Sequence, residues 1–116
     1  MTIKRIGAGA RMSKAVVHGN TVYLAGQVAD KTVGQGVAEQ TQEIVDLIDA
    51  ILAEAGSDKT KVLSATIYLA DISTFPEMNS VWDKWVVQGA TPARATLEAK
   101  LVAPQYKVEI AVIAAM

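Results

Sequence analysis

Residues 91–98 read Thr-Pro-Ala-Arg-Ala-Thr-Leu-Glu, and residues 106–115 read Tyr-Lys-Val-Glu-Ile-Ala-Val-Ile-Ala-Ala. The first segment alternates small or apolar residues with polar ones, and the second is rich in β-branched residues, so both are predicted to be strands. Residues 101–104 connect them, and Pro104 has no N–H to give to a sheet ladder. We therefore expect an antiparallel β-hairpin at the end of the chain.

Glu109 shares a face of the second strand with Ala111 and Ile113. A carboxylate in so apolar a place needs a partner, or it takes up a proton. If the strands pair symmetrically about the 101–102 bond, Arg94 lies opposite Glu109, whereas a shift of one residue would separate them. Such a pair is either a salt bridge that only stabilises the fold, or a site where Arg94 holds a planar anion and Glu109 moves a proton.

The bulk properties of the chain limit its class. With 116 residues, it is expected to form one domain, residues 1–116, around one core. A formal net charge of -1 argues against a general attraction to nucleic acid or to an anionic membrane. The absence of cysteine excludes disulfides, thiolate nucleophiles and thiolate metal sites. We find no signal peptide and no apolar run of membrane-spanning length, so a soluble cytoplasmic protein is expected.

A second hairpin and a helix are predicted in the first half of the chain. Residues 15–18 and 21–25 flank Gly19-Asn20, which favours a two-residue hairpin turn. Residues 37–54 carry apolar side chains at spacings of three and four, with acidic residues on the opposite face. This pattern predicts an amphipathic helix with a solvated acidic face, and Gly56 is expected to end it.

The third quarter predicts a strand followed by a second helix. Residues 62–69 alternate in polarity, as in a half-buried strand. Thr74 and Glu77 have the spacing of a capping box, from which a helix should run to about residue 87. Asn79 lies on or beside the inner face of that helix. It is either a buried amide that satisfies backbone groups or part of a site.

The predicted order of elements is ββαβαββ, with a possible additional strand at residues 3–6. Such an order favours an α+β sheet with both helices on one face. The uncovered face would carry Thr21, Tyr23 and Thr66 or their neighbours. A sheet face of this mixed polarity is usually covered by another subunit.

The motifs together resemble one known family. Residues 92–94 (Pro-Ala-Arg) and 107–110 (Lys-Val-Glu-Ile) resemble the C-terminal signature of the Rid family, the reactive-intermediate deaminases, also called the YjgF family. Residues 19–27, ending in Gly-Gln, resemble its first hairpin, and residues 78–82 resemble its second helix. The resemblance implies a chorismate-mutase-like fold and a homotrimer with sites between subunits. It also implies hydrolysis of enamines and imines, such as 2-aminoacrylate, to 2-keto acids and ammonia.

This resemblance suggests roles for particular side chains. Arg94 would hold the substrate carboxylate with its two-pronged guanidinium, and Glu109 would deliver water or a proton. Asn79 would lie near the substrate. The chemistry needs no metal and no organic cofactor.

Three positions depart from the RidA branch of the family and indicate a diverged member. Met12, Ala25 and Thr96 stand where many RidA proteins have Tyr, Ser and Cys, so the substrate site would be lined differently and be more apolar. A non-enzymatic or regulatory trimer that binds a small carboxylate is the alternative. RNA cleavage is disfavoured, because His18 is the only histidine and no basic stripe is interleaved with aromatic residues.

Overall fold

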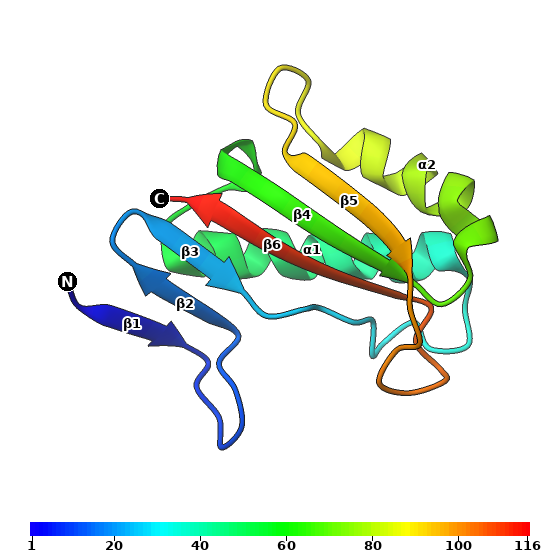
Figure 1. The fold of residues 1–116 in the computed structure, drawn as a ribbon, viewed down its shortest axis with the longest axis horizontal. Coiled ribbons are helices and arrows are strands. Elements are labelled where there is room, and N and C mark those ends of the chain that lie inside the picture. The colour runs from blue at the N-terminus through cyan, green and yellow to red at the C-terminus, as the bar shows by residue number, and fades with distance from the viewer.

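The computed structural model describes all 116 residues and contains a six-stranded sheet in the spatial order β1-β2-β3-β6-β4-β5 (Figure 1). The order along the chain confirms the predicted ββαβαββ pattern and the additional N-terminal strand. The elements are β1 (Ile3–Ile6), β2 (Ala15–His18), β3 (Thr21–Leu24), α1 (Val37–Ala55), the short 3-10 helix η1 (Lys59–Lys61), β4 (Val62–Leu69), the short 3-10 helix η2 (Ile72–Thr74), α2 (Phe75–Trp85), β5 (Ala93–Glu98) and β6 (Val108–Ala115).

Two glycines allow the chain to turn where the sequence predicts it. Gly19 has a φ of 61° at the first position of the β2–β3 turn, as a type II′ hairpin turn requires. Gly56 has a φ of 89° just after α1, where its N–H donates to the Ala53 carbonyl while Ser57 N–H donates to the Leu52 carbonyl. This pair of bonds is a Schellman motif, and it satisfies carbonyls that the end of the helix leaves without partners.

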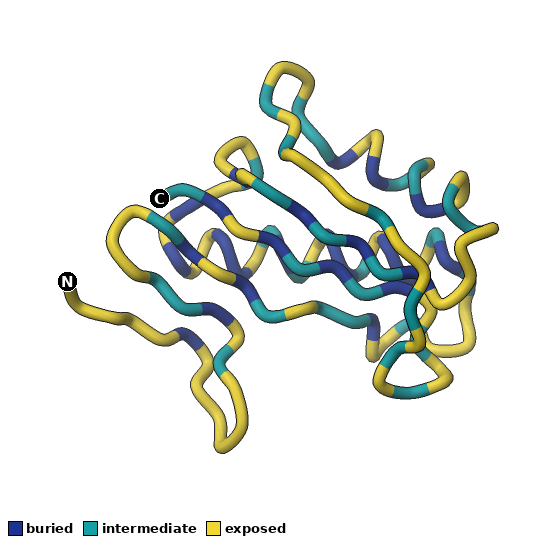
Figure 2. The backbone as a smooth tube through the Cα atoms, viewed as in Figure 1, coloured by how far each residue is buried: buried dark blue, intermediate teal, exposed yellow.

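The core lies between the sheet and the helices, which cover one face, as predicted. α1 runs behind the sheet in Figure 1, and α2 packs against α1. Buried and less buried residues alternate along β4 and β6 (Figure 2). Ile67 and Ile110 are fully buried on the helix side. Burial of each such side chain contributes about 1.5–3 kcal/mol. None of the helices is long and apolar enough to cross a membrane.

The predicted C-terminal hairpin is wrong. β5 pairs in parallel with β4, and β6 pairs antiparallel with the other edge of β4, so β4 separates the two strands. The α2 crossover returns the chain parallel to β4, as a strand–helix–strand unit does. β6 has the more apolar inner face and takes a central place between β3 and β4, whereas the more polar β5 forms an edge.

The predicted capping box at the start of α2 is also wrong. The Thr74 hydroxyl donates to the Asp71 carbonyl at 2.6 Å, and Glu77 accepts a hydrogen bond from Ala38 N–H at 2.8 Å. Glu77 therefore places a negative charge at the N-terminus of α1, which favours an anion. Glu77 thus links α2 to α1, whereas the capping-box spacing predicted that it would contact only its own helix.

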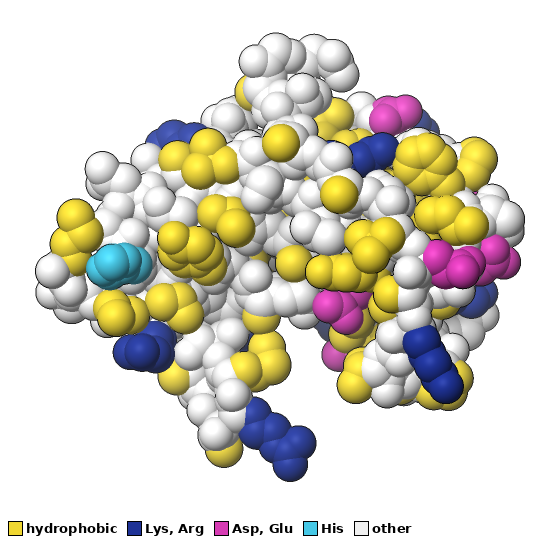
Figure 3. Space-filling model, in the orientation of Figure 1, with side chains coloured by type: hydrophobic (Ala, Val, Ile, Leu, Met, Phe, Trp, Pro, Cys, Tyr) yellow, Lys and Arg dark blue, Asp and Glu magenta, His cyan; other side chains and the backbone are white.

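The other face of the sheet is open in the single chain. Figure 3 views this face and shows hydrophobic side chains spread across it. Tyr23, Leu97 and Ile113 belong to it and remain 46%, 41% and 36% exposed. Between them lie smaller or polar residues, including Thr66. This is the mixed surface that the alternating pattern predicts.

Candidate functional site

Arg94 and Glu109 point to opposite faces of the sheet. Arg94 pairs with Ala65, whose side chain is in the core, whereas Glu109 pairs with Tyr68 on the open face. Partners in a sheet register share a face. The predicted contact between the two side chains within one chain is therefore wrong, because it depended on a hairpin that does not form. A site that contains both residues would need two chains.

The Arg94 guanidinium is held by α2. Its Nη1 donates to Asn79 Oδ1 at 2.8 Å, and its Cζ lies 5.5 Å from the Phe75 ring centroid and 5.4 Å from that of Trp82. Each cation–π contact contributes about 0.5–1 kcal/mol at an exposed site. Asn79 is not a buried amide that satisfies backbone groups. It is partly exposed and lies beside Arg94, as the other predicted role requires. One of the five guanidinium N–H donors is thus used for orientation.

A pocket of about 370 Å³ adjoins this guanidinium and is lined by Ile72, Phe75, Arg94 and Thr96. The buried Oγ1 of Thr96 has no hydrogen-bond partner. Leaving such a group unpaired costs about 1–3 kcal/mol. A planar cation beside apolar side chains can bind a small molecule that has a carboxylate at one end.

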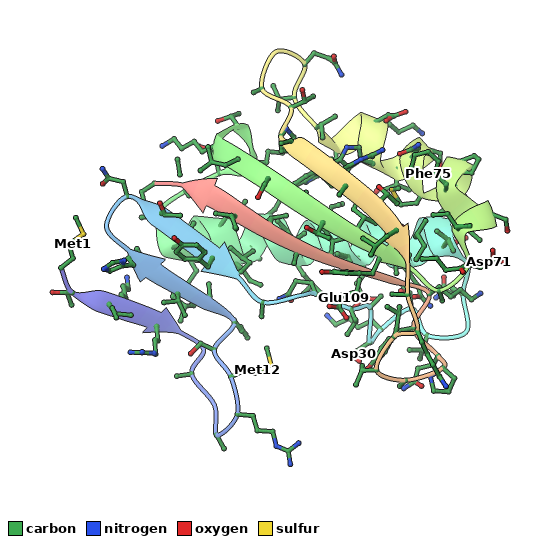
Figure 4. All side chains as sticks on the ribbon, viewed as in Figure 1. Met1, Met12, Asp30, Asp71, Phe75 and Glu109 are labelled. Atoms are coloured by element: carbon green, nitrogen blue, oxygen red, sulfur yellow. The ribbon has the colours of Figure 1, made fainter.

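Glu109 lies half-buried on the open face, against the backbone of the segment that follows β3. Its carboxylate passes so close to Gly26 that a Cβ there would be 2.3 Å from Oε2. Figure 4 shows Glu109 in the middle of the molecule and Phe75 on α2, well apart. Nothing in one chain joins the carboxylate to the guanidinium.

Met12 and Ala25 have different positions relative to these groups. Ala25 directly precedes Gly26, and its N–H donates to the Lys14 carbonyl at 2.9 Å, so it lies close to Glu109. Met12 is 59% exposed in the β1–β2 connection, and Figure 4 shows it apart from Glu109 and Phe75. The structure does not bring Met12 to either side chain within one chain.

Two interactions near Glu109 were missed by the sequence analysis. Gln40 of α1 is fully buried, accepts a hydrogen bond from Lys107 N–H at 2.9 Å and donates to the Gln105 carbonyl at 3.2 Å. The Tyr106 hydroxyl donates to Asp30, and this hydrogen bond raises the pKa of Tyr106 above its ordinary value. Both fix the residues just before β6, which carries Glu109. A glutamine in the apolar stripe of α1 is the signal that could have revealed the first.

Comparison with known proteins defines the family. Residues 2–116 match the family described as Endoribonuclease L-PSP. A RutC family protein of Haemophilus influenzae is 48% identical over 98% of both chains. The 2-iminobutanoate/2-iminopropanoate deaminase of Bos taurus is 37% identical over 97% of this chain and 85% of its own. The crystal structure of a YjgF family member from Neisseria meningitidis has a TM-score of 0.96 at 45% identity, covering 99% of this chain and 95% of the other. The chain belongs to this L-PSP/YjgF family, which confirms the resemblance to Rid proteins.

Proposed function

We propose that the protein hydrolyses reactive enamines and imines derived from amino acids, giving 2-keto acids and ammonia. The bovine relative supports the reaction class by its name. The observation that carries the proposal is the Arg94 guanidinium, which Asn79 orients beside a pocket that Phe75 and Thr96 also line. Such a guanidinium suits the carboxylate that every substrate of this class has.

The reaction requires a group that positions the substrate and one side chain that transfers protons. With the substrate carboxylate on Arg94, Glu109 accepts a proton from water as the water oxygen bonds to the imine carbon. Glu109 then returns this proton to the nitrogen, which gives a carbinolamine. Glu109 next carries the hydroxyl proton of the carbinolamine to the same nitrogen, so the carbonyl forms, the C–N bond breaks and ammonia leaves. A positioned acid–base group of this kind accelerates a reaction by about 10²–10⁴-fold.

The proposal requires a site between two subunits, because one sheet presents Arg94 and Glu109 on opposite faces, and we propose the homotrimer that the Rid resemblance implies. The open face supports it. Its exposed Tyr23, Leu97 and Ile113 have no cover within the chain, and a second copy would bury them. Sedimentation at micromolar concentration should give three times the monomer mass. A stable monomer would overturn the inter-subunit site.

A mixing experiment tests whether a site takes Arg94 from one subunit and Glu109 from another. Arg94→Ala and Glu109→Gln should each have only weak activity alone. When the two variants are unfolded together and refolded at equal amounts, about a quarter of the interfaces should combine an intact arginine with an intact glutamate. Activity near that fraction of wild type is expected. No recovery from trimers of confirmed mixed composition would contradict the shared site.

The activity itself is tested by generating imines in situ with an amino-acid oxidase and following their loss with and without the protein. Arg94→Lys keeps the charge but not the two-pronged grip, so substrate binding should weaken by about 1–3 kcal/mol. Glu109→Gln should bind a 2-keto acid as wild type does but turn over poorly. If wild type accelerates no imine from a panel of parent amino acids, the deaminase proposal fails.

The second candidate is a trimer that binds a small carboxylate without turnover. The same Arg94 pocket favours it, since binding needs only the guanidinium and its neighbours. Calorimetric titration with a 2-keto acid, together with an inactive imine assay, would support this reading. Incubation with labelled RNA checks the activity that the family description names.

A further inference from the structure

We propose that Gly26 is a positioning residue for Glu109, because the absence of a side chain at Gly26 leaves free the space that the Glu109 carboxylate occupies. The geometric part of this proposal rests on the structure alone. Its catalytic consequence rests on the proposed function of Glu109. The two parts are tested by different measurements.

The outer atoms of Glu109 occupy the space that a side chain at Gly26 would need. An ideal Cβ on Gly26 would lie 2.3 Å from Oε2, 2.9 Å from Cδ and 3.2 Å from Cγ of Glu109. The first two distances are far inside van der Waals contact, where atoms repel strongly. The present position of the carboxylate is therefore incompatible with any residue other than glycine at position 26.

The backbone around Gly26 is held on both sides, so it cannot move away from an added methyl group. Before it, Ala25 N–H donates to the Lys14 carbonyl at 2.9 Å. After it, Gln27 and Ile110 exchange both backbone hydrogen bonds, at 2.8 and 3.1 Å. The Gln27 side chain also donates to the Ala25 carbonyl at 2.9 Å. The clash would be relieved by rotation of the Glu109 side chain, which has three freely rotating bonds.

Backbone conformation does not explain the glycine. The φ of Gly26 is not positive, so alanine can adopt this backbone conformation without strain. Gly36 provides a comparison elsewhere in the chain. A Cβ there would also approach carboxylates, 2.9 Å from Glu39 Oε2 and 3.1 Å from Glu77 Oε2, and its φ is −78°.

Displacement of the carboxylate should affect turnover more than substrate binding. The guanidinium that would hold the substrate belongs to Arg94 of β5, whereas Gly26 follows β3, and β6 and β4 separate these two strands in the sheet. A misplacement of about 1 Å in a reacting group can cost about 10²-fold in rate. Gly26→Ala should therefore lower kcat by about that factor and leave KM close to that of wild type.

The kinetic test compares Gly26→Ala, Glu109→Gln and the double variant. If Gly26 acts through Glu109, adding Gly26→Ala to Glu109→Gln should lower kcat no further, since the affected group is already inactive. The matched control is Gly36→Ala, which should keep kcat within about twofold of wild type. Equal losses from Gly26→Ala in both backgrounds, or no loss in the wild-type background, would overturn the proposal.

A structural test does not depend on activity. The chain labelled with ¹³C at the glutamate carboxyls should show a changed chemical shift for the Glu109 carboxyl in Gly26→Ala, with the other glutamates unchanged, and crystals should show a rotated Glu109. An unchanged Glu109 would refute the positioning role even if wild type proves to have no deaminase activity. If Gly26→Ala does not fold, Gly26→Ala with Glu109→Ala should restore folding. Failure of both would mean that the backbone, not Glu109, requires the glycine.

Discussion

Gln40→Leu should loosen the segment that precedes β6 and cost the protein about 2 kcal/mol of stability. Gln40 makes two hydrogen bonds to the backbone, one from Lys107 N–H and one to the Gln105 carbonyl. Each bond contributes about 1 kcal/mol net. Leucine has a similar volume, so the substitution creates no large cavity in this fully buried place.

Urea unfolding followed by circular dichroism measures the total loss, and amide hydrogen exchange locates it. A loss of about 2 kcal/mol corresponds to about 30-fold in the opening equilibrium, so the Lys107 amide should exchange about 30-fold faster. Gln42→Leu is the matched control, because Gln42 is exposed and bonds only to Asp46 on its own helix. It should change stability by less than about 0.5 kcal/mol. Equal effects of the two substitutions, or unchanged exchange at Lys107, would refute the role assigned to Gln40.

Three further outcomes are expected. Burial raises the pKa of Asp49, although Trp85 Nε1 donates a hydrogen bond to its carboxylate at 3.0 Å. The stability that the protonated Asp49 side chain contributes is therefore lost as the pH rises through that raised pKa. Asp49→Asn keeps an oxygen that can accept the Trp85 hydrogen bond, and it should raise Tm at neutral pH by an amount that shrinks as the pH falls. Calorimetry that finds a higher Tm only in acid would contradict this pH dependence. Asp30→Asn should lower the pKa of Tyr106 toward its ordinary value in an alkaline absorbance titration, and an unchanged curve would count against their hydrogen bond. Thr96→Val removes an unpaired buried hydroxyl and should stabilise the protein by up to about 1 kcal/mol while weakening 2-keto acid binding in calorimetry. A clear loss of stability would show that the hydroxyl has a partner.

The types and order of the elements could be predicted because they depend on local patterns. The spacing of apolar residues indicated α1, and alternation indicated β4, whose predicted bounds of residues 62–69 agree with the structure. Gly19 and Gly56 indicated the turn and the helix end. These signals come from residues a few positions apart, where steric and solvation effects act directly.

The partners of β5 and β6 could not be predicted in the same way, because strand pairing is not local. Adjacency in sequence favoured a hairpin, but the α2 crossover and the apolar inner face of β6 decided the order. The wrong strand pairing also made the predicted arrangement of the site wrong. Arg94 and Asn79, predicted separately as site residues, are in contact, whereas Arg94 and Glu109, predicted as a pair, lie on opposite faces.

The central position of β6 has a consequence for how the chain reaches its native state. β6 is the last strand along the chain, yet it alone joins the β1–β3 ribbon to the β4–β5 pair. While the chain is being synthesised, these two halves have no common ladder until β6 has left the ribosome. Both would expose unpaired edges during that interval, and such edges pair readily with other chains. The sheet should therefore form only after β6 has been synthesised, and deletion of β6 should yield an aggregating chain and not a smaller folded one.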